Sequence, residues 1–240
     1  MQLSVVVPVL NEAENIRPLV AEIRAALDGK LDYEIIYVDD GSTDATPQIL
    51  AELRAQGPNF RSLRHVTRCG QSAGVRSGVK AARGTWIATL DGDRQNDPAD
   101  IPAMWDRAQQ EIATNPKPVL IAGWRVKRQD VLSKRIASRL ANKLRRAMLK
   151  DGTPDTGCGL KLFPREQFLE FPYFKHMHRY LCALMIRQGG HIVSVPVNHR
   201  HRTQGVSKYG NLDRALVGVS DLLGVAWLQR RASIPTANEE

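Results

Sequence analysis

Cysteine is scarce in this sequence and occurs in no pattern that would make it structural. The 240 residues contain only Cys69, Cys158 and Cys182, which lie far apart and form no C-x-x-C pair. An odd number of cysteines at such spacings argues against both a disulfide framework and a zinc site. We therefore expect a protein of a reducing compartment such as the cytosol.

Long apolar runs are missing as well. No stretch reaches the roughly 20 uninterrupted apolar residues that a membrane-spanning helix requires. The N-terminal residues MQLSVVVPVLNEAEN have no basic region before their apolar run and enter a strand pattern directly, so we expect no secretory signal. Any contact with a membrane is therefore predicted to be peripheral.

The common phosphate-binding loops are also absent. The sequence contains neither G-x-x-x-x-G-K-[ST] nor a G-x-G-x-x-G motif after a predicted strand. A calcium loop of the EF-hand type beginning at Asp91 is excluded, because its sixth position would be Asn96 instead of glycine and its twelfth Pro102 instead of glutamate. Phosphate chemistry in this protein would therefore need a different kind of site.

Positive charge, in contrast, is abundant. The chain has 34 Lys and Arg against 25 Asp and Glu, which gives a formal net charge of +9 and an isoelectric point near 9.7. This balance favours an anionic partner, which can be a nucleic acid, a phosphorylated small molecule or an acidic membrane surface. The length allows one large α/β domain or two small ones, each with a real core.

The first half of the chain alternates between short apolar strands and amphipathic helices. We predict strands at residues 3–9, 33–38, 63–66 and 85–90, separated by helices at about 14–27, 45–56 and 72–82. This alternation is typical of βαβ units and of a mostly parallel, twisted sheet. Ligands bind such sheets beyond the C-terminal ends of the strands.

Acidic and amide side chains follow three of these strands. The first runs into Asn-Glu at 11–12, the second into VDDGSTD at 38–44, and a later one into DGDRQ at 91–95. Asp91 and Asp93 are like charges one residue apart at the mouth of the sheet, and their oxygens suit Mg²⁺ or Mn²⁺. Such an ion keeps positions open for a diphosphate and offsets the charge on a departing nucleotide.

The same segments resemble a known family. SVVVPVLNEAENI, YEIIYVDDGSTDAT and ATLDGDRQNDP, in this order, resemble the family-two glycosyltransferases with the GT-A fold. In the second half, GWR, LSKRIASRLANKL, DTGCGLKLF and RTQGVSKYG are similar to the polyprenyl-phosphate branch, which includes dolichol-phosphate mannosyltransferase and its bacterial undecaprenyl-phosphate relatives. The resemblance covers nearly the whole chain and implies an α/β, Rossmann-like fold in which helices flank a mostly parallel, twisted sheet.

The resemblance also implies roles for individual residues. Contacts to the nucleotide sugar would come from Pro8, Leu10, Glu12, Val38, Asp39, Asp40, Asp91 and Gln95. The ligands of Mg²⁺ or Mn²⁺ would be Asp91, Asp93 and Gln95. The phosphate of the acceptor would be bound by Arg125, Lys134, Ser138, Arg202, Ser207 and Lys208. The residues that act directly in catalysis would be Asp91, Asp93, Arg125 and Arg202.

Several positions depart from the family or stay open. Leu10 stands where many relatives carry an aromatic residue, and Lys134 where some carry arginine, whose planar fork a lysine cannot reproduce. Asp155 is expected either to lie on the acceptor side or to hold a glycine-rich turn. His178 or Arg179 is a further candidate to face the acceptor, because relatives carry functional residues there.

By this resemblance we expect an inverting glycosyltransferase that moves a hexose from GDP-mannose or a UDP-sugar to a dolichyl or undecaprenyl type of polyprenyl monophosphate. A lipid phosphate is already anionic and needs no strong general base, so catalysis reduces to positioning and electrostatics. Two rival hypotheses are a related enzyme with a soluble or other lipid acceptor, and a non-catalytic binder of anionic lipid or nucleic acid. The second leaves the acidic strand ends unexplained, so we expect no nucleic-acid partner.

Two amphipathic segments are candidates for membrane contact. We assign residues 1–210 to a catalytic domain that includes a basic helix at about 131–149, and residues 211–240 to an amphipathic helix with a polar tail. The stripe of the first is Leu132, Ile136, Leu140, Leu144 and Met148. The stripe of the second is Leu212, Leu216, Val219, Leu223 and Ala226, followed by Trp227, Arg230 and Arg231.

Packing against the core is the alternative for each helix. If the segments do face lipid, the protein is expected on the cytoplasmic face of the inner membrane, held peripherally to an anionic surface and without a transmembrane helix.

Overall fold

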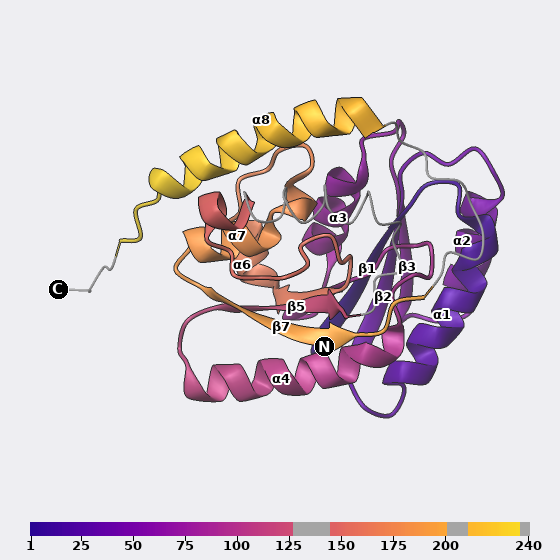
Figure 1. The fold of residues 1–240 in the computed structure, drawn as a ribbon. Coiled ribbons are helices and arrows are strands. Elements are labelled where there is room, and N and C mark those ends of the chain that lie inside the picture. Colours follow the sequence, from indigo (N-terminus) through magenta and orange to yellow (C-terminus); the bar gives the residue numbers. More distant parts are fainter. Residues whose placement is uncertain (127–144, 201–210, 236–240) are drawn as a thin grey trace.

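A seven-stranded sheet forms the centre of the protein in a computed structural model that describes residues 1–126, 145–200 and 211–235 (Figure 1). The strands are β1 (Leu3–Val9), β2 (Tyr33–Asp39), β3 (Phe60–Arg64), β4 (Trp86–Thr89), β5 (Val119–Arg125), β6 (Lys161–Pro164) and β7 (His191–Val197). Their spatial order is β3-β2-β1-β4-β6-β5-β7, and β6 runs antiparallel to both of its neighbours. Because β1, β2 and β4 are parallel and adjacent, their C-terminal ends lie at one edge.

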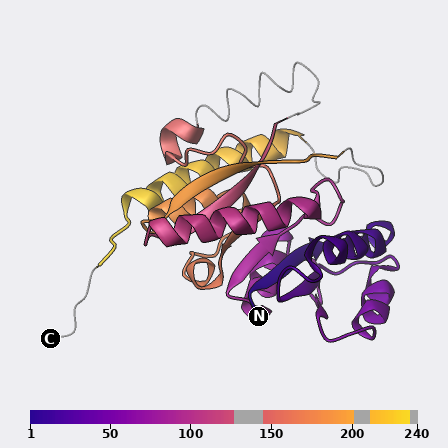
Figure 2. The same ribbon diagram turned by 90° about the horizontal axis from the view of Figure 1, so that it is seen from below.

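Helices cover both faces of the sheet. They are α1 (Ala13–Leu27), α2 (Thr46–Arg54), α3 (Gln71–Ala81), α4 (Ile101–Thr114), α6 (Arg165–Leu169), α7 (Leu181–Arg187) and α8 (Asn211–Arg230), with short 3-10 turns η1 (Pro98–Asp100) and η2 (Met177–Arg179). In the view from below, α4 lies in front of the sheet and α8 behind it (Figure 2).

The central strands are buried on both faces, which explains their continuous apolar sequences. Val5 and Val7 of β1 belong to a cluster that includes Ile16 of α1, whereas Val6 packs on the other face with Val79 of α3. Successive side chains of a strand point to opposite faces, so one apolar run supplies both halves of the core.

Helix α8 packs one face against α7 and exposes another. Its inward residues join a small buried cluster made of Leu149, Tyr180, Ala183, Leu222, Val225 and Ala226. The side chains of Val219, Leu223 and Trp227 are between 55% and 59% exposed. The predicted stripe is therefore wrong at Ala226, which α8 turns toward α7, and the side chains of Leu212 and Leu216 lie outside those described.

Most predicted elements of the first half are confirmed, with one shift. The strand expected at 63–66 is β3 at Phe60–Arg64, because buried Phe60 begins the pairing with β2 while Val66 is fully exposed. Of the predicted basic helix, residues 127–144 lie outside the described ranges. Residues 145–149 are helical, and Met148 packs against the cluster beneath α8 instead of facing outward. Among the helices described, none combines the length and apolarity needed to cross a bilayer.

Candidate functional site

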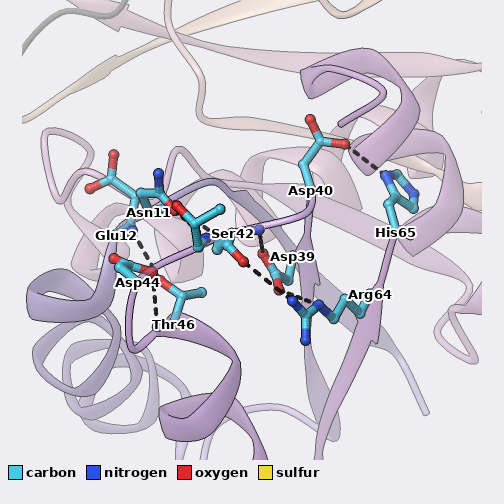
Figure 3. A network of polar contacts seen from close by, with 10 residues as sticks. Asn11, Glu12, Asp39, Asp40, Ser42, Asp44, Thr46, Arg64 and His65 are labelled. Carbon is cyan, nitrogen blue, oxygen red and sulfur yellow. Dashed lines mark hydrogen bonds and ion pairs between the residues drawn. The ribbon is translucent and has the colours of Figure 1, made fainter. Parts of the chain in front are cut away.

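The loops that follow β1 and β2 are tied together by hydrogen bonds (Figure 3). The amide of Asn11 donates to Ser42 Oγ at 2.8 Å, and Asn11 Oδ1 accepts from the Thr43 amide at 2.8 Å. Asp44 Oδ1 accepts from the amide of Thr46 at the start of α2. Asn11 adopts a left-handed φ of 51°, which asparagine tolerates better than most residues. The two loops therefore form one rigid rim at the edge of the sheet.

The carboxylate of Asp39 supports this rim from inside. It is 1% exposed, and its Oδ1 accepts a hydrogen bond from the Ser42 amide at 2.9 Å. Arg64 of β3 approaches its other oxygen at 3.4 Å. Val38, which precedes Asp39, has a side chain fully buried in the core, so it can contact a ligand only through its backbone.

Asp40 is the anchor of a second loop. Its oxygens accept hydrogen bonds from the backbone amides of Cys69 and Gly70 at 2.8 and 2.7 Å, and His65 Nδ1 lies 2.8 Å away. Asp40, His65 and Cys69 are also the one described trio of potential ligand side chains whose ligand atoms lie within 4.8 Å of one another. Because hydrogen bonds already engage both Asp40 oxygens, we interpret this trio as a structural cluster that fixes the loop before α3 and not as a metal site.

Asp91 and Asp93 follow β4 directly. Asp91 Oδ1 accepts a hydrogen bond from Gln71 Nε2 at 2.8 Å, and the backbone of Gly159 passes so close that a Cβ there would overlap the Asp91 carboxylate. Burial raises the pKa of Asp91 to about 6, and the charge of Asp93 acts in the same direction. The two carboxylates thus share a confined place where their repulsion is felt.

Arg125, at the end of β5, lies near Asp91 and forms an ion pair with Asp155. Its Nε and one terminal nitrogen donate to the two oxygens of Asp155 at 2.6 and 2.8 Å, which is the bidentate geometry of a strong ion pair. Gly157 lies where a Cβ would come within 3.1 Å of this guanidinium. Asp155 therefore holds the glycine-rich turn around Arg125, one of the two roles considered for it.

A cavity of about 210 Å³ lies beside Asp91, between the ends of β1 and β4 and the segment before β6; we call it the β4–β6 cavity. Its polar lining consists of Gln71, Thr89, Asp91, Thr156, Lys161, His178 and Arg179. Lys161 is 3% exposed, and its ammonium group donates to the backbone carbonyls of Cys158 and Thr156. These bonds fold the 156–159 turn over a buried positive charge.

His178 is held against α3 by Ser72. The Ser72 hydroxyl oxygen accepts a hydrogen bond from the His178 amide at 3.2 Å and lies 2.7 Å from His178 Nδ1. Burial, together with the neighbouring positive charge of Arg179, lowers the pKa of His178 to about 3. The imidazole is therefore neutral at physiological pH.

An ion-pair network joins α1 to both sides of the site. Glu22 of α1 accepts from Arg94 at 2.6 Å and from Arg200 at 2.7 Å, and Arg200 also pairs with Asp97 at 2.7 Å. The Arg200 amide donates to the backbone carbonyl of Gln95 at 3.0 Å. The loop that carries Asp93 is thus fastened to the chain segment that leads into residues 201–210.

The structure brings part of the predicted site together. Pro8 and Asp91 line the β4–β6 cavity, and the Gln95 amide donates to Asp93 Oδ1 at 3.2 Å in the adjoining loop. At the ends of β1 and β2 lie Leu10, Glu12, Val38, Asp39 and Asp40. The predicted residues outside the described ranges are Lys134, Ser138, Arg202, Ser207 and Lys208.

Sequence reasoning missed several residues that shape the site. They are Glu22, Gln71, Lys161 and Arg200. A lysine inside the apolar run GLKLF is a detectable signal, since buried lysines are rare. Glu22 and Arg200 give no such signal, because nothing in their local sequence distinguishes them from solvated surface charges.

Comparison with known proteins agrees with this architecture. A family model described as Glycosyl transferase family 2 matches residues 4–170. The dodecaprenyl-phosphate galacturonate synthase of Rhizobium johnstonii is 35% identical over 98% of this chain and 69% of that protein. The undecaprenyl-phosphate 4-deoxy-4-formamido-L-arabinose transferase of Edwardsiella ictaluri is 33% identical over 86% of this chain and 62% of its own length. The chain thus spans less than the full length of both relatives.

A solved structure shares the fold. Glucosyl-3-phosphoglycerate synthase from Mycobacterium tuberculosis, in complex with Mg²⁺ and uridine diphosphate, superposes with a TM-score of 0.66 at 20% identity, covering 98% of this chain and 81% of that one. The predicted fold class, a mostly parallel α/β sheet of the GT-A type, is confirmed.

Proposed function

The chain belongs to glycosyl transferase family 2, and we propose that it transfers a hexose, with inversion, from a nucleoside diphosphate to a polyprenyl monophosphate. The observation that carries this proposal is the meeting of the Asp91–Asp93 loop with Arg125 and the 155–159 turn at one edge of the sheet. Support for a lipid acceptor comes from the two relatives, which are named for dodecaprenyl and undecaprenyl phosphate.

Asp91 and Asp93, with Gln95 beside them, fit a divalent cation such as Mg²⁺ or Mn²⁺. They offer hard oxygen ligands, and a cation would offset both effects that raise the pKa of Asp91, first its burial and then the charge of Asp93. The solved synthase with the same fold is complexed with Mn²⁺ and uridine diphosphate in a related structure. When bound, the ion would offset the negative charge that develops on the departing diphosphate.

The rim of the first two strands would bind the nucleoside. Asp40 presents a carboxylate whose orientation is fixed by the Cys69 and Gly70 amides, while Asp39 keeps the Ser42 loop in shape. Leu10 and Glu12 follow β1 on the same rim. Because this rim is preorganised, little conformational freedom remains to be lost when the nucleotide binds.

The reaction itself joins two anionic substrates. An oxygen of the acceptor phosphate forms a bond to the anomeric carbon, while the bond from that carbon to the diphosphate breaks and its electron pair leaves with the nucleoside diphosphate. Arg125, fixed by Asp155, would reduce the repulsion between the two substrates. We assign the remaining contacts to the acceptor phosphate to Lys134, Ser138, Arg202, Ser207 and Lys208.

We also propose that the protein rests on the cytoplasmic face of an anionic membrane. The exposed stripe of Val219, Leu223 and Trp227 on α8 ends near Arg230 and Arg231, a combination of apolar and basic residues that suits a membrane interface. A lipid acceptor requires such an approach, because its phosphate lies at the bilayer surface.

The proposal is tested with purified protein, Mn²⁺ and short polyprenyl phosphates, offered with radiolabelled GDP- and UDP-sugars. Label should enter the organic phase, and chelation or Asp93→Ala should reduce its transfer by at least about 100-fold. Transfer to water-soluble phosphorylated acceptors instead would identify the soluble-acceptor alternative. Activity that survives both chelation and Asp93→Ala would refute the metal role.

A further inference from the structure

Positively charged side chains outnumber negatively charged ones in the lining of the β4–β6 cavity. Arg179 lines it, and no acidic side chain in the described ranges forms an ion pair with this guanidinium. The buried ammonium of Lys161 donates to the neutral carbonyls of Thr156 and Cys158. The one carboxylate of the lining, Asp91, is a proposed ligand of the metal. An unbalanced guanidinium beside a confined cavity favours an anionic ligand group.

His178 adds a neutral donor to this charge. The Ser72 hydroxyl lies 2.7 Å from His178 Nδ1, and we assign the tautomer in which it donates its proton there while its oxygen accepts from the His178 amide. Nδ1 then acts as the acceptor, and the single proton of the neutral imidazole resides on Nε2. His178 therefore offers the cavity an N–H group without a charge.

The donors of this lining do not match a neutral hexose well. Each sugar hydroxyl donates as well as accepts, and carboxylates are the acceptor-only side chains that best satisfy hydroxyl donors. Here the one carboxylate of the lining, Asp91, accepts from Gln71 and is a proposed ligand of the metal. The guanidinium of Arg179 and the imidazole of His178 both donate, which suits a group that only accepts.

We propose that the β4–β6 cavity binds the carboxylate of a sugar acid, so that the preferred donor is a nucleoside diphosphate hexuronate. This inference rests on the proposed function, since it names the sugar that the transferase moves. Arg179 would grip the carboxylate with its planar fork, and His178 would donate beside it. The shared chemistry is an anionic oxygen group, which a sugar carboxylate, the acceptor phosphate or the donor diphosphate can supply.

Matched donors separate these sources. UDP-galacturonate with UDP-galactose, and UDP-glucuronate with UDP-glucose, differ only in the oxidation state at C6, and GDP-linked pairs extend the panel. With polyprenyl phosphate and Mn²⁺, wild-type protein should use one uronate with a kcat/KM at least about 100-fold above that of its neutral partner. Arg179→Gln should lower that ratio at least about tenfold, whereas Arg179→Lys should retain part of it because the charge remains.

The control is Lys175→Gln, which removes an exposed positive charge in the same segment but does not line the cavity. Its donor ratio should equal that of wild type. Titration calorimetry of each nucleotide sugar against the Mn²⁺-loaded protein measures the same preference without turnover, so a slow variant remains informative.

The possible outcomes are distinct. Equal use of uronate and neutral donors by wild type would overturn the sugar-acid inference and leave the proposed function intact. An equal loss with both donors in Arg179→Gln would assign Arg179 to the acceptor phosphate or the diphosphate, which also overturns it. If no donor in the panel is transferred to any polyprenyl phosphate, the proposed function itself fails.

Discussion

Gly159, in the turn before β6, shows how one residue without a side chain positions a carboxylate in the loop after β4. A Cβ at this position would overlap the Asp91 carboxylate and come within 2.8 Å of Asn96 Oδ1. We expect Gly159→Ala to displace Asp91 and to lower kcat by about 100-fold, the loss that a misplacement of about 1 Å can produce. Overpacking should lower the free energy of unfolding by only about 1–3 kcal/mol. Steady-state kinetics and thermal unfolding measure the two effects separately.

A matched glycine provides the control at this scale. Gly224 in α8 has open space around its Cβ position, so Gly224→Ala should leave activity unchanged and stabilise the helix by about 0.5–1 kcal/mol. Wild-type turnover and wild-type affinity for Mn²⁺ in Gly159→Ala would mean that the 156–159 turn yields without moving Asp91, contrary to the expectation.

Among the elements, α1 has a role beyond closing the core, because Glu22 bridges Arg94 and Arg200. We expect Glu22→Gln to release the Asp93 loop from the segment that leads into residues 201–210, and to lower kcat on the order of tenfold. The ion pairs are partly exposed, so the loss of unfolding free energy should stay below about 1 kcal/mol for each pair. Kinetics with varied acceptor, together with thermal unfolding, provide the measurement.

Glu52→Gln is the corresponding control, since it breaks an ion pair between α2 and Arg17 of α1 away from the site. Both variants should unfold at similar temperatures, and only Glu22→Gln should lose turnover. Equal kinetics for the two would show that the Glu22 bridge has no positioning role.

Part of this arrangement of strands and helices could be predicted from the sequence alone. Apolar runs and the acidic strand ends predicted β1, β2, β4 and the edge where they meet, because periodicity and turn chemistry are local signals. The position of β3 was missed, since pairing with β2 buries Phe60 and leaves Val66 outside. The partnership of Glu22 with Arg200 joins residues far apart in the chain, and no local pattern encodes it. Long-range side-chain geometry is therefore the part that needed the structure.

At the scale of the whole molecule, the membrane contact that we propose would combine excess positive charge with an exposed apolar stripe. The stripe of Val219, Leu223 and Trp227 lies on α8, and the chain carries a net charge of +9. Basic residues near an anionic surface contribute about 1 kcal/mol each, and this attraction weakens with salt. We expect binding to vesicles that contain anionic phospholipid, weaker binding to neutral vesicles, and release as the salt concentration rises.

Replacing Leu223 and Trp227 together by glutamine should weaken this binding at least about tenfold, because each apolar side chain contributes about 1.5–3 kcal/mol when buried in lipid. Neither residue belongs to the buried cluster beneath α8, so the fold should be retained. Ile112→Gln on α4 is the control, since Ile112 is 45% exposed and α4 lies on the other side of the sheet from α8 (Figure 1). Vesicle flotation measures all three proteins. Equal flotation of the double variant and wild type would place the lipid contact elsewhere. If Ile112→Gln lost as much flotation as the double variant, the protein would bind lipid through both sides and not specifically through α8.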